Sequence, residues 1–85
     1  KEDSFIIFPN PVIGDLWIIT NKNTMKGDRL KLFNITGMLI AEHVIENEKL
    51  EKINLSNMSS GLYLLQITSD KQKFTKKLLL ARPNN

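Results

Sequence analysis

Apolar residues along this chain of 85 residues come in short bursts, and each burst is closed by glycine, proline, asparagine or serine. The bursts are rich in Ile, Leu, Phe, Tyr and Trp, and no stretch sustains the period of a helix, so the pattern is typical of β-strands. It predicts seven strands, at residues 5–8, 16–20, 29–34, 38–44, 50–55, 62–68 and 73–80.

The spacing of these strands indicates the class of fold. Their starts lie 9 to 13 residues apart, with turn residues between them, which is the pattern of an antiparallel sandwich or barrel. Parallel βαβ units would need helical segments, which the sequence lacks. We therefore predict an all-β fold, a seven-stranded antiparallel Ig-like β-sandwich.

The segment Asn34-Ile35-Thr36-Gly37 has the composition of a tight turn. Asparagine stands at the first position of a type I turn and glycine at the fourth, where a left-handed backbone closes a hairpin. We expect this segment to join the third and fourth strands, with Gly37 at positive φ.

The segment Phe8-Pro9-Asn10-Pro11 contains two prolines, which cannot donate a hydrogen bond to a sheet. Each proline also pushes the residue before it into an extended conformation. We interpret the segment as a rigid, extended connector that ends the first strand, with the Asn10 amide left to hydrogen-bond a neighbouring loop.

The segment from Leu55 to Tyr63 is interpreted as a strand end, a one-turn cap begun by Ser56, and an entry into the sixth strand led by Gly61. A tyrosine two residues after this glycine resembles the tyrosine corner of Ig-like sandwiches. We therefore expect the Tyr63 hydroxyl to bond the backbone a few residues upstream.

The last two strands differ in character. Apolar residues occupy both faces of the sixth strand, which suits a central position in a sheet. The seventh strand carries Lys76 and Lys77 among its apolar residues, and lysines on an edge strand deter aggregation. We therefore expect the seventh strand at an edge, and the unpaired edges of so small a module could also pair weakly between copies.

Composition bounds the size and type of the domain. With 41% hydrophobic residues, the chain can build one compact core, so we assign residues 1–85 to a single domain with a core of about 5–82. There is no cysteine for a disulfide, and the single histidine, His43, cannot form a metal centre alone. The longest apolar runs are four residues, too short for a membrane helix. Because the chain opens at Lys1 without a methionine or a secretory signal, we interpret it as excised from a larger secreted protein.

The formal net charge is +3, and its distribution is uneven. Four glutamates surround a single lysine in the middle of the chain, whereas every charged residue after Asp70 is basic. These basic residues are Lys71, Lys73, Lys76, Lys77 and Arg82. Two interpretations stay open: solvated strand edges protected against aggregation, which we favour, and a docking surface for an anionic partner.

Motifs that carry catalytic chemistry are absent from the sequence. There is no nucleophile elbow, zinc-protease helix, phosphate-binding glycine loop or calcium loop. His43 has acidic neighbours in Glu42 and Glu46 but no accompanying nucleophile, so we interpret it as a surface histidine on a strand. We predict that the chain is not an enzyme and that it binds no metal or cofactor.

Two kinds of ligand are compatible with a small basic β-domain. A nucleic-acid module needs aromatic residues among the basic ones, but the basic end has only Phe74, which we assign to the core, so nucleic acid is not expected. A carbohydrate-binding or adhesin-type accessory module stays open as the alternative, because Trp17 and Phe33 lie on strands where they could face outward. The simpler interpretation is that both pack on the sandwich.

Four motifs follow one another along nearly the whole chain. They are Phe8-Pro9-Asn10-Pro11-Val12 followed by Leu16 and Ile18, then Asn34-Ile35-Thr36-Gly37, then Ile53-Asn54-Leu55-Ser56 leading to Gly61-Leu62-Tyr63-Leu64, then Lys76-Lys77-Leu78-Leu79-Leu80. In their order and spacing they resemble the type A C-terminal sorting domain of the type IX (Por) secretion system of Bacteroidetes.

The resemblance implies a function in protein export. Family members stand at the end of larger passenger proteins, which are exported through the periplasm to the cell surface or the medium. An outer-membrane translocon recognises the sorting domain, and a sortase-like peptidase then removes it and attaches the passenger to the surface. Cleavage is expected upstream of Phe5.

The resemblance also assigns the residues that carry the sorting signal. They are Pro9, Asn10, Pro11, Gly37, Gly61, Tyr63, Lys77, Leu78, Leu79 and Leu80. The last four belong to the closing strand that the translocon reads. Family members end close to the final basic position, which Arg82 matches, so the extension Pro83-Asn84-Asn85 is a departure from the family pattern.

Overall fold

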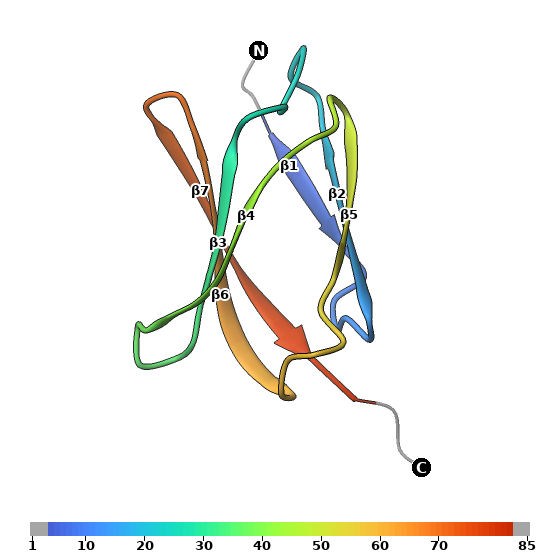
Figure 1. Ribbon diagram of the computed structural model, residues 1–85, viewed down its shortest axis with the longest axis vertical. Helices are drawn as coiled ribbons and strands as arrows, with labels where there is room; N and C mark the ends of the chain where they lie inside the picture. The colour runs from blue at the N-terminus through green and yellow to red at the C-terminus, as the bar shows by residue number, and fades with distance from the viewer. Residues whose placement is uncertain (1–3, 83–85) are drawn as a thin grey trace.

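The computed structural model describes residues 4–82, which form an all-β structure (Figure 1). Its strands are β1 (Phe5–Phe8), β2 (Asp15–Thr20), β3 (Arg29–Phe33), β4 (Leu39–Val44), β5 (Leu50–Asn54), β6 (Gly61–Ser69) and β7 (Gln72–Leu80). Each strand is where the sequence predicted it, and no boundary differs by more than one residue. Between residues 4 and 82 there is no helix, and therefore none with the length and apolar character that crossing a membrane requires.

The strands form two antiparallel sheets. One sheet has the strand order β1-β2-β5, and the other has the order β4-β3-β6-β7. Figure 1 shows the sheets as two layers, with the three-stranded sheet on the right. Each sheet combines strands from both halves of the chain, as in Ig-like sandwiches, so the predicted fold class is confirmed. The predicted positions of the last two strands are confirmed as well, because β6 is central and β7 lies at an edge.

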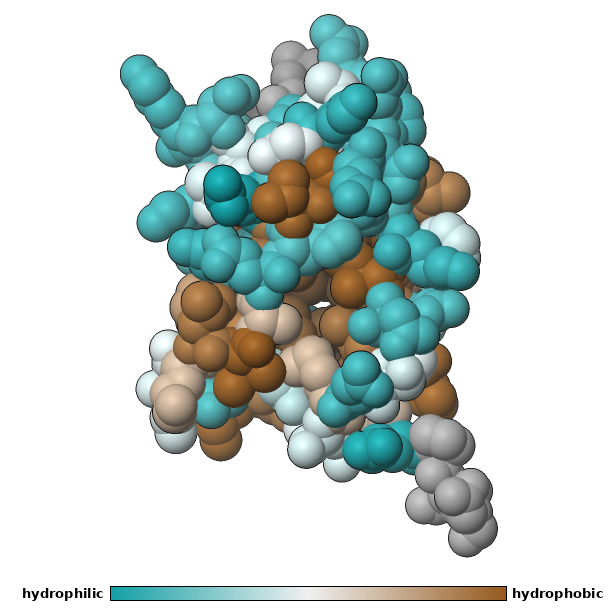
Figure 2. Space-filling model, viewed as in Figure 1, coloured by the Kyte–Doolittle hydropathy of each residue, from teal (hydrophilic) through white to brown (hydrophobic). Residues whose placement is uncertain are grey.

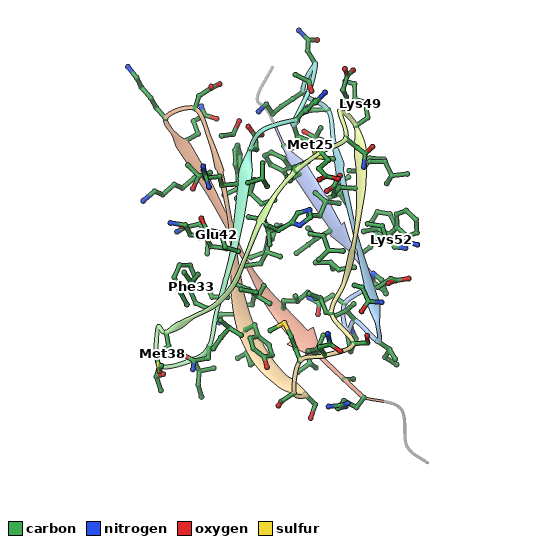
Figure 3. All side chains as sticks on the ribbon, viewed as in Figure 1. Met25, Phe33, Met38, Glu42, Lys49 and Lys52 are labelled. Atoms are coloured by element: carbon green, nitrogen blue, oxygen red, sulfur yellow. The ribbon has the colours of Figure 1, made fainter. Side chains whose placement is uncertain are left out.

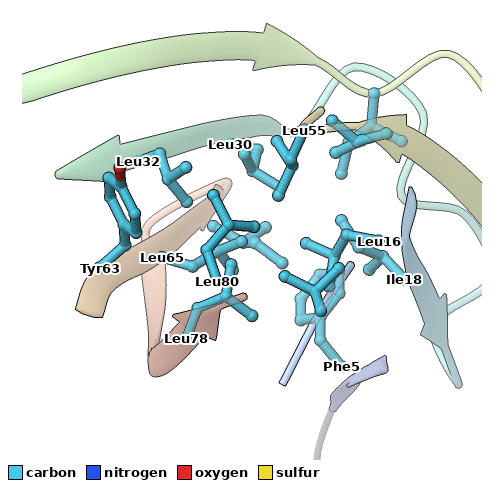
Figure 4. Packing of buried hydrophobic residues seen from close by; sticks show 14 of the residues in the cluster. Phe5, Leu16, Ile18, Leu30, Leu32, Leu55, Tyr63, Leu65, Leu78 and Leu80 are labelled. Carbon is cyan, nitrogen blue, oxygen red and sulfur yellow. The ribbon is translucent and has the colours of Figure 1, made fainter. Parts of the chain in front are cut away.

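The space between the sheets is filled by one apolar cluster (Figure 4). Alternate residues of each strand point into it, because successive side chains of a strand face opposite sides of the sheet. Leu16 and Ile18 of β2, and Leu65 and Ile67 of β6, expose no more than 1% of their surface. Because the sequence contains no cysteine, burial of this apolar surface is the main stabilising term that the fold offers.

A largely buried lysine side chain joins the two sheets at one end of the sandwich. The Nζ atom of Lys22, which follows β2, lies 2.8 Å from Oδ2 of Asp28 and also donates to the hydroxyl of Ser69. The side chains of this ion pair are each only 11% exposed. The ammonium group lies 5.8 Å from the ring centroid of Phe5, within range of a cation–π contact. The ammonium group of Lys22 thus contacts residues of both sheets.

His43 lies on a strand, β4, as predicted, and its side chain is partly exposed, but its carboxylate partner was not foreseen. Its Nε2 lies 2.6 Å from Oε2 of Glu51, a β5 residue with 3% of its surface exposed, and not beside the carboxylates of its sequence neighbours. Glu51 also accepts hydrogen bonds from the N–H groups of Glu46 and Asn47 and from the Asn47 side chain. Burial opposes ionisation of Glu51, but the hydrogen bonds outweigh it and hold the pKa of this carboxyl below its ordinary value.

Candidate functional site

Three groups of predicted sorting-motif residues that are separated in the sequence meet along β7. They are Pro9 to Pro11, Gly61 with Tyr63, and Lys77 to Leu80. This strand is the outer strand of its sheet, and β6 is its inner neighbour. In their register, Gly61 pairs with Leu80 and Tyr63 pairs with Leu78. On the other side of β7 lies the segment of residues 9–12, which we call the strap.

The strap leaves β1 in the three-stranded sheet and crosses to the outer edge of β7 in the other sheet. The peptide bonds before both of its prolines are cis. Asn10 binds the backbone of β7 through its side chain: Nδ2 donates to the carbonyl oxygen of Lys77 at 3.2 Å, and Oδ1 accepts from the N–H of Leu79 at 2.9 Å. The side-chain amide therefore takes the place of a peptide group in a neighbouring strand.

Val12 continues this ladder with its main chain. Its N–H donates to the carbonyl of Leu79, and its own carbonyl accepts from the N–H of Ala81, both at 2.9 Å. The side chain of Val12 is fully buried, so the strap is anchored in the core as well as on the strand. The expected bond from Asn10 to a loop was therefore wrong, because Asn10 binds a strand 67 to 69 residues away.

The other half of β7 has an open outer edge. The N–H and carbonyl groups of Leu79 both point to the strap, away from β6. Because the backbone groups of successive residues point alternately to the two sides of an antiparallel strand, those of Lys73 and Thr75 point to the same outer side as those of Leu79. Within residues 4–82, no neighbouring strand or side chain pairs with these outward groups. The edge of β7 is thus closed at its C-terminal end and open at its N-terminal end.

The side chains of the closing strand face two directions. Leu78 and Leu80 point into the core and are 0% and 3% exposed. Lys77 and Leu79 lie on the outer face, where Leu79 is 45% exposed. A protein that binds the folded domain can therefore contact Lys77 and Leu79, whereas Leu78 and Leu80 act by holding the strand in place.

Gly61 and Tyr63 form the corner through which the chain enters β6. The Tyr63 hydroxyl donates to the carbonyl of Ser59 at 2.7 Å, so the predicted tyrosine corner is confirmed. Gly61 has a φ of 151°, which residues with a side chain rarely adopt. The preceding turn differs from the prediction, because the side chain of Asn54 organises it by accepting from the N–H and the hydroxyl of Ser56.

Gly37 lies apart from the strap, at the end of the β3–β4 hairpin, and its φ of 89° confirms the predicted left-handed backbone. Oδ1 of Asn34 accepts three hydrogen bonds, from the N–H of Thr36 at 3.0 Å, from its hydroxyl at 2.8 Å, and from the N–H of Met38 at 2.9 Å. The N–H of Gly37 donates to the main-chain carbonyl of Asn34 at 3.0 Å. The turn therefore pairs most of its own N–H groups.

An apolar groove of about 430 Å³ lies between this turn and β7, on the outer face of the four-stranded sheet. Phe33, Leu62 and Leu64 supply apolar surface, and Lys77 adds a positive charge. Gly37 also belongs to the lining. The groove therefore brings the hairpin turn to the same outer face as the exposed side chains of the closing strand.

The two aromatic residues considered for carbohydrate binding lie on opposite faces of the sandwich. Trp17 is half-buried on the outer face of the three-stranded sheet, between Phe8 and Lys52, and the Lys52 ammonium lies 5.7 Å from its ring centroid. Phe33 is half-buried on the outer face of the other sheet, and Figure 3 shows Phe33 and Lys52 on opposite sides of the molecule. Neither aromatic residue is part of the core. The two residues therefore cannot form one binding platform.

Comparison with known proteins relates this chain to a family. The family model described as "Secretion system C-terminal sorting domain" matches residues 6–81. Ulvan lyase NLR42 of Nonlabens ulvanivorans is 24% identical over 74 residues, which are 87% of this chain and 14% of that protein. The chain thus spans about a seventh of the length of this relative.

Proposed function

The chain belongs to the family of secretion system C-terminal sorting domains, and we propose that β7 and the strap on its edge form the surface that the type IX secretion machinery reads. The resemblance inferred from the four sequence motifs is thereby confirmed. A domain of this family is a sorting signal for type IX secretion, and it directs export to the cell surface or the extracellular space.

The observation that carries the proposal is the ladder between the strap and β7. Asn10 holds Lys77 and Leu79 by two hydrogen bonds, so a motif near the start of the domain fixes the geometry of its last strand. A partner that reads the folded domain can contact only exposed groups, and Leu79 is such a group. We therefore assign recognition to Lys77 and Leu79, and assign a positioning role to Asn10 and to the corner residue Tyr63.

We further propose that residues 1–85 act as one unit with a core of about 5–82, carried at the end of a passenger protein. The partners are then the outer-membrane translocon and the sortase-like peptidase, which removes the domain and attaches the passenger to the surface. The chain itself carries no catalytic centre in this proposal. The expected cleavage upstream of Phe5 stays a prediction, and residues 1–3 and the extension Pro83-Asn84-Asn85 lie outside the described residues.

A reporter fusion tests the proposal. Residues 1–85 are fused behind a periplasmic reporter in a bacterium with type IX secretion, and surface display of the reporter is measured. We expect the unchanged fusion to reach the surface and the double variant Lys77→Gln/Leu79→Ser to stay in the periplasm. The matched control is Lys52→Gln/Leu50→Ser, which removes one lysine and one exposed leucine from the other sheet.

Each result of the fusion experiment decides one part of the proposal. If the unchanged fusion stays in the periplasm, the sorting function of these residues is refuted. If the Lys77→Gln/Leu79→Ser fusion is displayed as efficiently as the control, the machinery does not read the outer face of β7. Circular dichroism of the purified variants separates loss of recognition from loss of folding.

A second function, carbohydrate binding, rests on a separate observation. Phe8 is 41% exposed and lies beside Trp17, so the two rings and Lys52 form a small aromatic face on the three-stranded sheet. We expect specific glycan binding, if this function exists, to be lost in Trp17→Ala. Screening the isolated domain and this variant against glycans tests it, because binding that survives the substitution would come from elsewhere on the surface.

A further inference from the structure

The end of the β3–β4 hairpin, residues 35–40, is an exposed apolar tip. Ile35 is 77% exposed, Met38 63%, Leu39 49% and Ile40 45%. In Figure 1 this hairpin projects at the lower left, and in Figure 2 brown side chains gather over the same region. No charged residue occurs in the sequence between Lys31 and Glu42. Such a concentration of exposed apolar side chains marks an interaction surface.

Several polar groups of the tip already have hydrogen-bond partners within the turn. Asn34 accepts from the N–H groups of Thr36, Gly37 and Met38 through its side chain and its carbonyl, and the Thr36 hydroxyl donates to the same side chain. A polar group moved into an apolar medium is unfavourable unless it is hydrogen-bonded, and here the turn supplies the partners itself. The tip can therefore leave water without losing these hydrogen bonds.

Charges on the adjoining outer face of the four-stranded sheet are mostly positive. Strand β3 places Arg29 and Lys31 on this face, and β7 places Lys73 and Lys77 there. Among the described residues of these strands, β4 adds the single carboxylate of Glu42. Arg29 already lies 3.5 Å from that carboxylate. Lys77 belongs to the apolar groove beside the tip. The face therefore combines an apolar end with a net positive surface, which complements an anionic partner.

We propose that the tip of the β3–β4 hairpin inserts into an anionic lipid surface, with Lys31 and Lys77 next to the lipid phosphates. Apolar side chains beside a basic face are the combination by which interfacial elements bind such membranes. Exposure is greatest at Ile35 and Met38, at the projecting end of the hairpin, and is lower in the strand that follows. A projecting apolar end with few unpaired N–H groups fits a deformable apolar medium better than the flat surface of a protein.

Binding to lipid vesicles tests the proposal with the whole chain of 85 residues. The probe is a vesicle of phosphatidylglycerol and phosphatidylcholine, compared with phosphatidylcholine alone, and sedimentation measures the bound fraction. We expect Ile35→Ser/Met38→Ser to weaken binding at least tenfold. The matched control Ile6→Ser/Leu50→Ser, which removes two exposed apolar residues from the other sheet, should bind within twofold of the original chain.

Two further measurements separate insertion from simple electrostatic attraction. Replacing Lys31 or Lys77 by glutamine is expected to weaken binding about fivefold for each lysine, since a basic residue near an anionic surface contributes about 1 kcal/mol. Because the chain has no cysteine, Met38→Cys or Ile6→Cys creates one site for an environment-sensitive dye. Dye at position 38 should enter the hydrocarbon and be quenched by spin-labelled acyl chains, whereas dye at position 6 should not.

The possible results all bear on the proposal. It is overturned if the original chain does not bind anionic vesicles, if the tip variant binds as well as the control, or if dye at position 38 stays in water while the chain is bound. Analytical ultracentrifugation without lipid covers the remaining alternative. A dimer that dissociates in Ile35→Ser/Met38→Ser would assign the tip to contact with a second copy and would also overturn the proposal.

Discussion

The two edge strands of the four-stranded sheet, β7 and β4, are shielded in different ways. The strap closes the C-terminal half of β7, and lysines are spread along this strand. Within residues 4–82, β4 has no strap, and its side chains Leu39 and Ile40 are nearly half exposed. A register shift at Leu32 and Phe33 interrupts its pairing with β3. Such a bulge hinders the addition of another strand.

The different shielding of β7 and β4 suits two different requirements on an edge strand. In our proposal β7 is an edge that a partner reads, and such an edge must hold its side chains in one arrangement. The strap can do this because it binds β7 opposite β6. An edge that does not have to present one arrangement of side chains to a protein can be irregular, as β4 is. No residue of β4 is buried, whereas Leu78 and Leu80 of β7 are, so we expect substitutions along β7 to destabilise the fold more than substitutions along β4.

The largest effect is expected from the buried side of β7. Leu78 is fully buried, so Leu78→Ala should lower the free energy of unfolding by about 2–5 kcal/mol. Leu39 of β4 is 49% exposed. Leu39→Ala should lower the free energy of unfolding by less than about 1 kcal/mol, since its substitution changes little buried apolar area. Urea unfolding measures both values. Equal losses would show that the two edges contribute alike to the core.

The next effect concerns the strap itself. Asn10→Ala removes two hydrogen bonds to β7, each of which contributes about 0.5–1.5 kcal/mol. The substitution should therefore lower the free energy of unfolding by about 1–3 kcal/mol. Amide exchange of Leu79 should accelerate, because its N–H loses its acceptor, while exchange in β4 should not change. Asn10→Asp, which keeps an acceptor for Leu79, is the control and should protect this amide better than alanine. Unchanged exchange at Leu79 in Asn10→Ala would contradict the role of the strap.

A smaller effect on stability is expected from the turn of the β3–β4 hairpin, just before β4. Gly37→Val should cost at least about 1–2 kcal/mol, because a β-branched residue is unfavourable in the left-handed region. No atom lies within 4 Å of a Cβ added there, so the backbone conformation alone is tested. Asparagine tolerates this region, and Gly37→Asn should therefore recover much of the loss in thermal unfolding. Equal stability of the two variants would mean that the turn can relax to another conformation.

The sequence predicted the strands well because their signals are local. Alternation of apolar residues and the glycines, prolines and asparagines of the turns act within a few residues, and every strand boundary was within one residue of its position. The tyrosine corner of Tyr63 and the left-handed Gly37 were predictable for the same reason. Both depend on neighbours no more than four residues away.

The contacts that assemble the candidate site were not predictable, because they join distant segments. Asn10 was expected to bond a loop, but its partners Lys77 and Leu79 are brought to it only by the strand order of the sandwich. The partner of His43 was missed likewise, since Glu51 lies on a strand of the other sheet. Local patterns identify which residues can form hydrogen bonds, whereas the topology decides with whom.

The smallest effect on the free energy of unfolding is expected only at acidic pH. It concerns the contact between His43, near the end of β4, and Glu51 of β5. The pKa of Glu51 is lower in the folded chain than in the unfolded one, so the unfolded chain binds more protons in the acidic range and stability rises with pH there. The contribution is complete above the ordinary carboxyl pKa of about 4.3 and is lost as the pH falls through the lower folded value. Glu51→Gln should remove this part of the pH dependence, measured by urea unfolding between pH 3 and 7. Glu48→Gln removes an exposed carboxylate as a control, and identical acid profiles of the two variants would show that folding does not lower the pKa of Glu51.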